Sequence, residues 1–115
     1  MSARREAAPV LLGSLEEQVM LSVLRTEPEA YGMNVRRELE SVTGREITIG
    51  SVYATLDRLE AKGLVASERT AGPETASRRV FIVTPAGARS LAQTRATRER
   101  LWTGVSLRDL QDLGR

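Results

Sequence analysis

The order of periodic patterns along the chain restricts its fold more than any other feature. Four segments carry apolar residues at helical spacing, and two short segments rich in β-branched residues lie between the third and fourth. The helical segments are 15–26, 31–43, 49–62 and 85 to about 103; the strand-like segments are 64–69 and 78–84, joined by loop residues 71–77. The sequence therefore predicts a mainly α fold with a small β-hairpin.

Residues typical of helix ends support these boundaries. Polar N-cap residues precede the helical segments, and glycines that tolerate the left-handed conformation follow two of them. The predicted N-caps are Ser14 in a capping box with Glu17, Thr48 or Ser51, Thr84 before Pro85, and Ser106 before a last short helix; the glycines are Gly44 and Gly63. Glu27-Pro28 is expected to stop the first helix.

Three helices followed by a two-stranded hairpin predict a winged helix-turn-helix. The length of 115 residues fits one domain of this kind with an extension. We expect residues 1–13 to be a flexible N-terminal arm, 14–84 the winged-helix domain, and 85–115 a C-terminal dimerisation helix and tail.

The third helical segment carries two different stripes. Its apolar stripe for the core consists of Ile49, Val52, Leu56 and Leu59, and its second stripe consists of Ser51, Ala54, Thr55, Arg58 and Lys62. Small residues permit close approach to the DNA major groove, hydroxyls bind phosphates or base edges, and arginine reaches guanine or phosphate. The second stripe therefore predicts a helix that binds double-stranded DNA, although an ordinary solvated face has the same composition.

Three further residues are candidates for DNA contact. Arg78 and Arg79 open the second strand, and alternation in a strand directs them to opposite faces. Either arginine fits a phosphate contact or a charged strand edge that discourages aggregation. Tyr53 lies on the flank of the third helix, where it either fills space or donates its hydroxyl to a phosphate.

The fourth helical segment has apolar residues early and late, with charged residues between them. Leu91 belongs to the early group, and Leu101, Trp102 and Val105 form the late group. A long helix beyond a completed winged-helix core must bury its late residues, and a second copy of the chain is the simplest partner. The alternative for Trp102 is packing against the first helix of its own chain.

Composition excludes several other kinds of site. The chain has no Cys and no His, so disulfides, thiolate or imidazole catalysis and Cys/His zinc sites are not expected. No apolar run reaches the roughly 18 residues of a membrane span. The acidic pairs Glu16-Glu17 and Asp109/Asp112 fit helix N-terminal charges better than a general acid and base. We expect no enzymatic activity, no cofactor and a cytoplasmic location.

The net charge of +2 is too small to identify the partner by itself, so a winged-helix module that binds protein remains the alternative function. A protein-docking face more often carries an exposed aromatic or aliphatic anchor, and the second stripe of the third helix has none.

Six short stretches together resemble the PadR family of bacterial transcriptional regulators. They are Leu12-Gly13-Ser14-Leu15-Glu16, Tyr31-Gly32, Gly50-Ser51-Val52-Tyr53 with Leu56, Leu59-Glu60, Lys62-Gly63-Leu64-Val65 and Thr84-Pro85-Ala86-Gly87. No single stretch is specific, but their order and spacing over residues 12–104 are. The chain is similar to the short subfamily, which has one C-terminal helix.

The resemblance implies a homodimeric repressor that binds a pseudo-palindromic operator through the third helix, with the wing on the flanking backbone. Tyr53 matches the family tyrosine that holds DNA backbone, and Arg78 and Arg79 match basic residues of the wing. Ala54 and Phe81 depart from the proline and tyrosine that are frequent there. Some short members bind a flat aromatic effector between tryptophans at the dimer interface. Either such a small-molecule site or none is compatible with Trp102.

Overall fold

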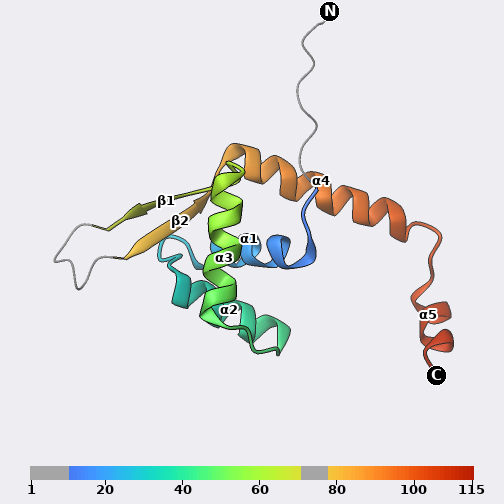
Figure 1. Cartoon of the computed structure of the whole chain (residues 1–115). Helices are drawn as coiled ribbons and strands as arrows, with labels where there is room; N and C mark the ends of the chain where they lie inside the picture. The colour runs from blue at the N-terminus through green and yellow to red at the C-terminus, as the bar shows by residue number, and fades with distance from the viewer. Residues whose placement is uncertain (1–10, 71–77) are drawn as a thin grey trace, which may run out of the picture.

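The computed structural model describes residues 11–70 and 78–115, and the elements in them follow the predicted order (Figure 1). They are α1 (Ser14–Thr26), α2 (Gly32–Thr43), α3 (Ile49–Ala61), β1 (Val65–Arg69), β2 (Arg79–Val83), α4 (Pro85–Trp102) and α5 (Leu107–Leu113). The first three helices pack together, and the β1–β2 hairpin projects beside α3 (Figure 1). The winged helix-turn-helix with a long C-terminal helix is confirmed.

Two sequence-based expectations fall on residues outside the described ranges. They are the 71–77 loop and residues 1–10 of the N-terminal arm. The described end of the arm is attached to the domain, because the backbone N–H of Leu12 donates to Thr94 Oγ1 in α4 at 3.0 Å.

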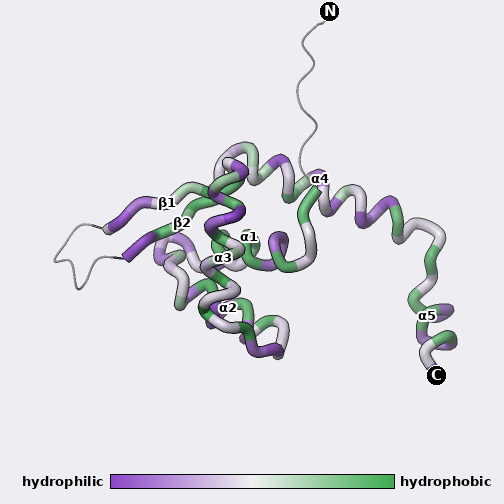
Figure 2. Tube along the Cα trace, in the orientation of Figure 1, coloured by the Kyte–Doolittle hydropathy of each residue, from purple (hydrophilic) through white to green (hydrophobic). Residues whose placement is uncertain are grey.

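The hydrophobic core lies where the three helices meet the base of the hairpin. Its fully buried side chains come from every element of the winged helix: Val19, Met20 and Val23, Val35, Val52, Leu56 and Leu59, and Phe81. The hairpin changes from hydrophobic at its base to hydrophilic toward its tip (Figure 2). The predicted inward stripe of α3 is confirmed for Val52, Leu56 and Leu59, and Ile49 packs at its edge.

The helix ends explain why the chain changes direction where it does. Thr48 caps α3 by accepting from Ser51 N, so Thr48 rather than Ser51 is the N-cap. The Thr84 and Ser106 caps are also confirmed. Gly44 and Gly63 have φ values of 70° and 76°, the left-handed conformation predicted for them.

The capping box predicted from Ser14 and Glu17 is wrong by one residue. Gly13 is the N-cap of α1, and its N–H donates to Glu16 Oε1 at 3.0 Å. Glu17 instead forms an ion pair with Arg98 of α4. Because adjacent glutamates satisfy the same sequence pattern, only the tertiary partner of Glu17 decides which one turns back to the helix start.

The segment before α2 lies along the hairpin. β1 and β2 pair antiparallel with Arg69 opposite Arg79, and Tyr31 forms an isolated bridge with Val80. The N–H of Phe81 donates to Ala30 O at 2.9 Å. These bonds bring the N-terminus of α2 against the wing.

Candidate nucleic-acid interface

The exposed face of α3 consists of small residues beside one arginine. Ser51, Ala54 and Arg58 are exposed, as is Gly50 in the first turn. Thr55 does not join them, because it is only 1% exposed and belongs to the core side of the helix. Its hydroxyl is within 3.4 Å of Arg58 Nη2. The expectation of an exposed Thr55 is therefore corrected: the residue lies at the edge between stripe and core, where tertiary packing determines burial.

The basic end of α3 is tied to α1 by one carboxylate. Glu16 Oε2 lies 2.7 Å from Lys62 Nζ and 3.9 Å from Arg58 Nε. The hydrogen bond from Lys62, and then the one from the N–H of Gly13, hold the pKa of Glu16 below its ordinary value of 4.5. Arg58 remains 54% exposed, so it is available to a ligand while Lys62 is held.

Replacing Glu16 by glutamine tests this tie. A carboxylate with a lowered pKa stabilises the folded state above its ordinary pKa, and that contribution disappears as the pH falls through the lowered value. We therefore expect E16Q to be less stable than the native chain at neutral pH, with the difference closing below pH 4.5. Urea denaturation across this range is the measurement. The charge-matched variant E38Q, which breaks an exposed pair with Arg25, is the control; a pH-independent E16Q difference would contradict the assignment.

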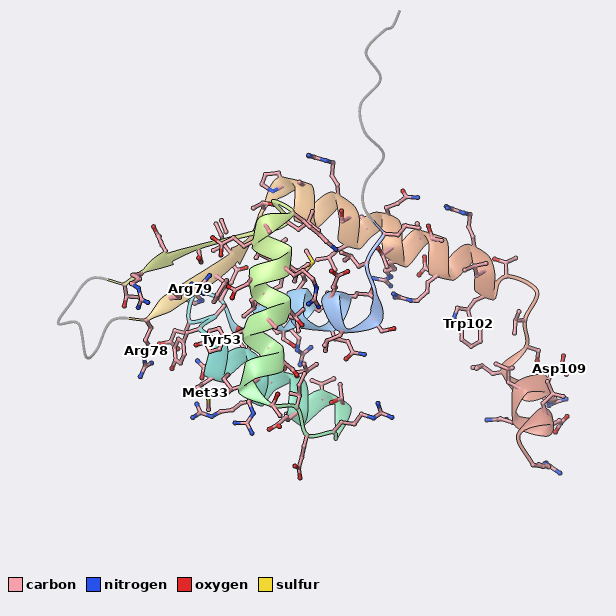
Figure 3. All side chains as sticks on the ribbon, viewed as in Figure 1. Met33, Tyr53, Arg78, Arg79, Trp102 and Asp109 are labelled. Atoms are coloured by element: carbon pink, nitrogen blue, oxygen red, sulfur yellow. The ribbon has the colours of Figure 1, made fainter. Side chains whose placement is uncertain are left out.

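A basic groove lies between α3, the start of α2 and the wing. Its volume is about 460 Å³. The lining residues of this basic groove are Tyr31, Met33, Arg37, Tyr53, Arg69, Arg78 and Arg79. Figure 3 shows Met33, Tyr53, Arg78 and Arg79 gathered on this side of α3, with Trp102 and Asp109 at the far end of the molecule.

Three arginines of the basic groove are exposed and have no carboxylate partner among the described residues: Arg37, Arg69 and Arg78. The guanidinium of Arg78 lies over the Tyr31 ring, 4.3 Å from its centroid. Arg37 donates to Asn34 Oδ1 at 3.2 Å. Stacking and a neutral acceptor orient these cations without neutralising them, so the groove is available to an anion.

Arg79 has a different role from its neighbour. It lies 3.0 Å from Asp57 and 2.8 Å from Glu60, both on α3, and covers the Phe81 ring. Partial burial disfavours the charged guanidinium, but the hydrogen bonds and charges of the two carboxylates outweigh this and raise its pKa. The expected divergence of Arg78 and Arg79 is confirmed, and Arg79 braces the wing against α3.

Tyr53 is half-buried and completes the floor of the basic groove. Its ring lies on the first turn of α2: a Cβ added at Gly32 would stand 2.4 Å from the Tyr53 hydroxyl oxygen. Gly32 thus gives the ring its place. The sequence analysis included Tyr53, Arg78 and Arg79 but missed Arg37 and Arg69. Arg69 was predictable, since it ends the strand on the other side of the hairpin tip.

The four residues predicted at a dimer interface are not equivalent. Leu91 packs partly against its own core. Leu101, Trp102 and Val105 are 73%, 47% and 47% exposed. Trp102 shares a hollow of about 330 Å³ with Arg98, Leu101, Val105 and Leu110 at the end of α4.

Other chemistry is not apparent in the described ranges. Residues 11–70 and 78–115 contain no group of three or more Asp or Glu residues placed to hold a metal ion. In the same part of the chain, no helix combines the length and the apolar character needed to cross a bilayer.

A winged helix with a small-residue α3 face and an adjoining cationic groove defines a class of DNA-binding regulators. Comparison with known families is more specific. The model of the transcriptional regulator PadR-like family matches residues 20–93, and the chain belongs to this family.

Individual relatives agree with the family match. Transcriptional regulator Rv3488 of Mycobacterium tuberculosis is 40% identical over 73 residues, which are 64% of this chain and 66% of the relative. The structure of a PadR family regulator from Eggerthella lenta is similar with 30% identity and a TM-score of 0.62, covering 79% of this chain and 83% of that one. A PadR-like transcription factor from Bacteroides fragilis shares the fold at 24% identity and a TM-score of 0.69, covering 79% and 85%.

Proposed function

We propose that the chain is a dimeric repressor that binds a pseudo-palindromic operator through α3 and the basic groove. The exposed face of α3 enters the major groove, where Ser51 and Ala54 permit close approach and Arg58 reaches a base edge. Arg37, Arg69 and Arg78 contact phosphates of the flanking backbone, and Tyr53 adds its hydroxyl. Occupation of a promoter by this dimer excludes RNA polymerase, which is sufficient for repression.

The observation that carries the proposal is the contrast between paired and unpaired cations. Lys62 and Arg79 are held by carboxylates of their own chain, whereas the exposed arginines of the basic groove are not. Of the eight residues we first assigned to DNA, Thr55 and Arg79 therefore position the interface, and Lys62 is held beside it. The direct contacts are assigned to Ser51, Tyr53, Ala54, Arg58 and Arg78.

Dimerisation is proposed from the late apolar residues of α4. Leu101, Trp102 and Val105 are exposed in one chain and have the character of an interface core. A two-fold pair would present two copies of α3 about one helical turn of DNA apart, as a palindromic operator requires.

Replacing Arg58 by alanine tests the base contact. We expect specific binding to weaken by about 1–3 kcal/mol, with relaxed preference at one operator position. Anisotropy titrations against the operator and its single-base variants measure both effects. R25A, which removes an exposed arginine from the C-terminal end of α1, is the control and should bind as the native chain does. Native affinity and native preference in R58A would remove Arg58 from the interface.

A further inference from the structure

The C-terminal helix α5 is fully formed yet has nothing packed over it. Ser106 caps it by accepting from the N–H groups of Arg108 and Asp109. None of its residues is buried, and Leu107, Leu110 and Leu113 are 67%, 39% and 81% exposed. A helix of 7 residues is unstable alone in water. Its leucines therefore require a partner surface.

A matching apolar groove lies on the opposite part of the molecule, between α1 and α4. We call it the α1/α4 groove; its volume is about 640 Å³. Its apolar lining consists of Leu21, Leu24, Val83, Ala88, Leu91 and Ala92. Leu21 and Leu24 are 42% and 46% exposed, although neighbouring residues of α1 form the core. The α1/α4 groove is thus a preformed but uncovered receptor for apolar side chains.

The charges at the rim of the α1/α4 groove complement those of α5. Arg95 and Arg98 border the groove, accompanied by Glu17 and Glu99. Asp109 and Asp112 accompany the leucines on α5. An α5 helix in the groove can therefore add carboxylates beside the rim arginines while burying its leucines.

The groove and the helix that fits it are kept apart within one chain. The 18 residues of α4 extend over about 27 Å and carry α5 away from the winged helix (Figure 1). Because α4 forms one wall of the groove and also bears α5, two chains related by a two-fold axis can exchange these parts reciprocally. The occupant that the arrangement favours is a second copy of this chain.

We propose that α5 of each protomer docks into the α1/α4 groove of a second copy, so that the C-terminal segment clasps the dimer. This proposal rests on the dimer of the proposed function and assigns to α5 a contact separate from that of Trp102. It also explains why six of the eleven exposed large apolar side chains in the described residues lie in 101–113 and two more on α1.

Crosslinking tests the contact directly, because the native chain has no cysteine. A Leu24→Cys variant is mixed with a Leu110→Cys variant and treated with a short bis-maleimide. The expected product is a covalent dimer that contains both variants and increases with the length of pre-incubation. The matched control replaces Leu24→Cys by Val42→Cys, an equally accessible apolar position on α2 that should give little product.

A chain carrying both substitutions separates the two occupants of the groove. Bridging between chains supports the proposal. Bridging within a single chain would overturn it in favour of α5 folding back on its own protomer. A mixture that crosslinks no better than the Val42→Cys control would overturn it as well.

Sedimentation equilibrium distinguishes failure of this proposal from failure of the proposed dimer. Alanine at Leu107, Leu110 and Leu113 together should weaken self-association roughly a hundredfold. The monomer should keep its helical content, because these side chains are exposed in it. A native dimer that the triple substitution leaves equally tight would refute the α5 contact alone. A monomeric native chain would refute both.

Discussion

Replacement of Gly87 by alanine is expected to lower the free energy of unfolding by about 2–3 kcal/mol, even though alanine favours helix. A Cβ on Gly87 would stand 2.0 Å from the carbonyl oxygen of Leu64 and 3.0 Å from Met20 Cε. Leu64 O is a backbone atom that also accepts from Thr84 N at 3.1 Å, so it cannot move without loosening the α4 junction. Thermal unfolding at fixed protein concentration should show a fall in Tm of about 10–20 °C.

Gly50 provides the matched control for that substitution. It also lies in the first turn of a helix, but an added Cβ would meet only Thr48 Oγ1 at 4.0 Å. Alanine there should be neutral or stabilising by up to about 1 kcal/mol. Equal stability changes for G87A and G50A would show that the close approach of α4 to Leu64 is not a constraint on the fold.

Removal of two unpaired arginines from the basic groove is expected to have the largest effect on DNA binding. In the double variant R37A/R78A, operator affinity should fall by about 3 kcal/mol, or roughly a hundredfold, because each lost contact is a charge-assisted hydrogen bond. The slope of log K against log salt should become less negative by about 1.8, since each phosphate contact contributes about 0.9. Anisotropy titrations at several salt concentrations give both quantities.

The double variant R89A/R100A is the control for charge. Both arginines are exposed on α4, outside the basic groove, so the net charge changes equally while the salt slope should not. If the two double variants lose the same affinity and slope, the overall charge of the protein, rather than the basic groove, determines binding.

Local sequence patterns predicted most of the fold because they describe short-range chemistry. Thr84 before Pro85 and the glycines at 44 and 63 each satisfy backbone groups within one turn, so their role is visible without a structure. The α1 cap was misplaced because Glu16 and Glu17 satisfy the same pattern. Their assignment depends on Lys62 and Arg98, which are 46 and 81 residues away in sequence.

The candidate site was only partly predictable for a related reason. Helical periodicity places Ser51, Ala54 and Arg58 on one face, and they are exposed together. It cannot show that Thr55 is buried, since the neighbouring core determines where the exposed arc ends. Nor can it bring Arg37 of α2 to the wing, because the bridge between Tyr31 and Val80 that does so joins residues distant in sequence.

Footprinting of the native chain on duplex DNA from the region upstream of its own gene tests the central claim most directly. We expect protection of two stretches with centres about 10 base pairs apart, as two α3 helices in successive major grooves would give, and loss of protection as salt rises. Absence of protection on every duplex in dilute salt would contradict binding through α3 and the basic groove.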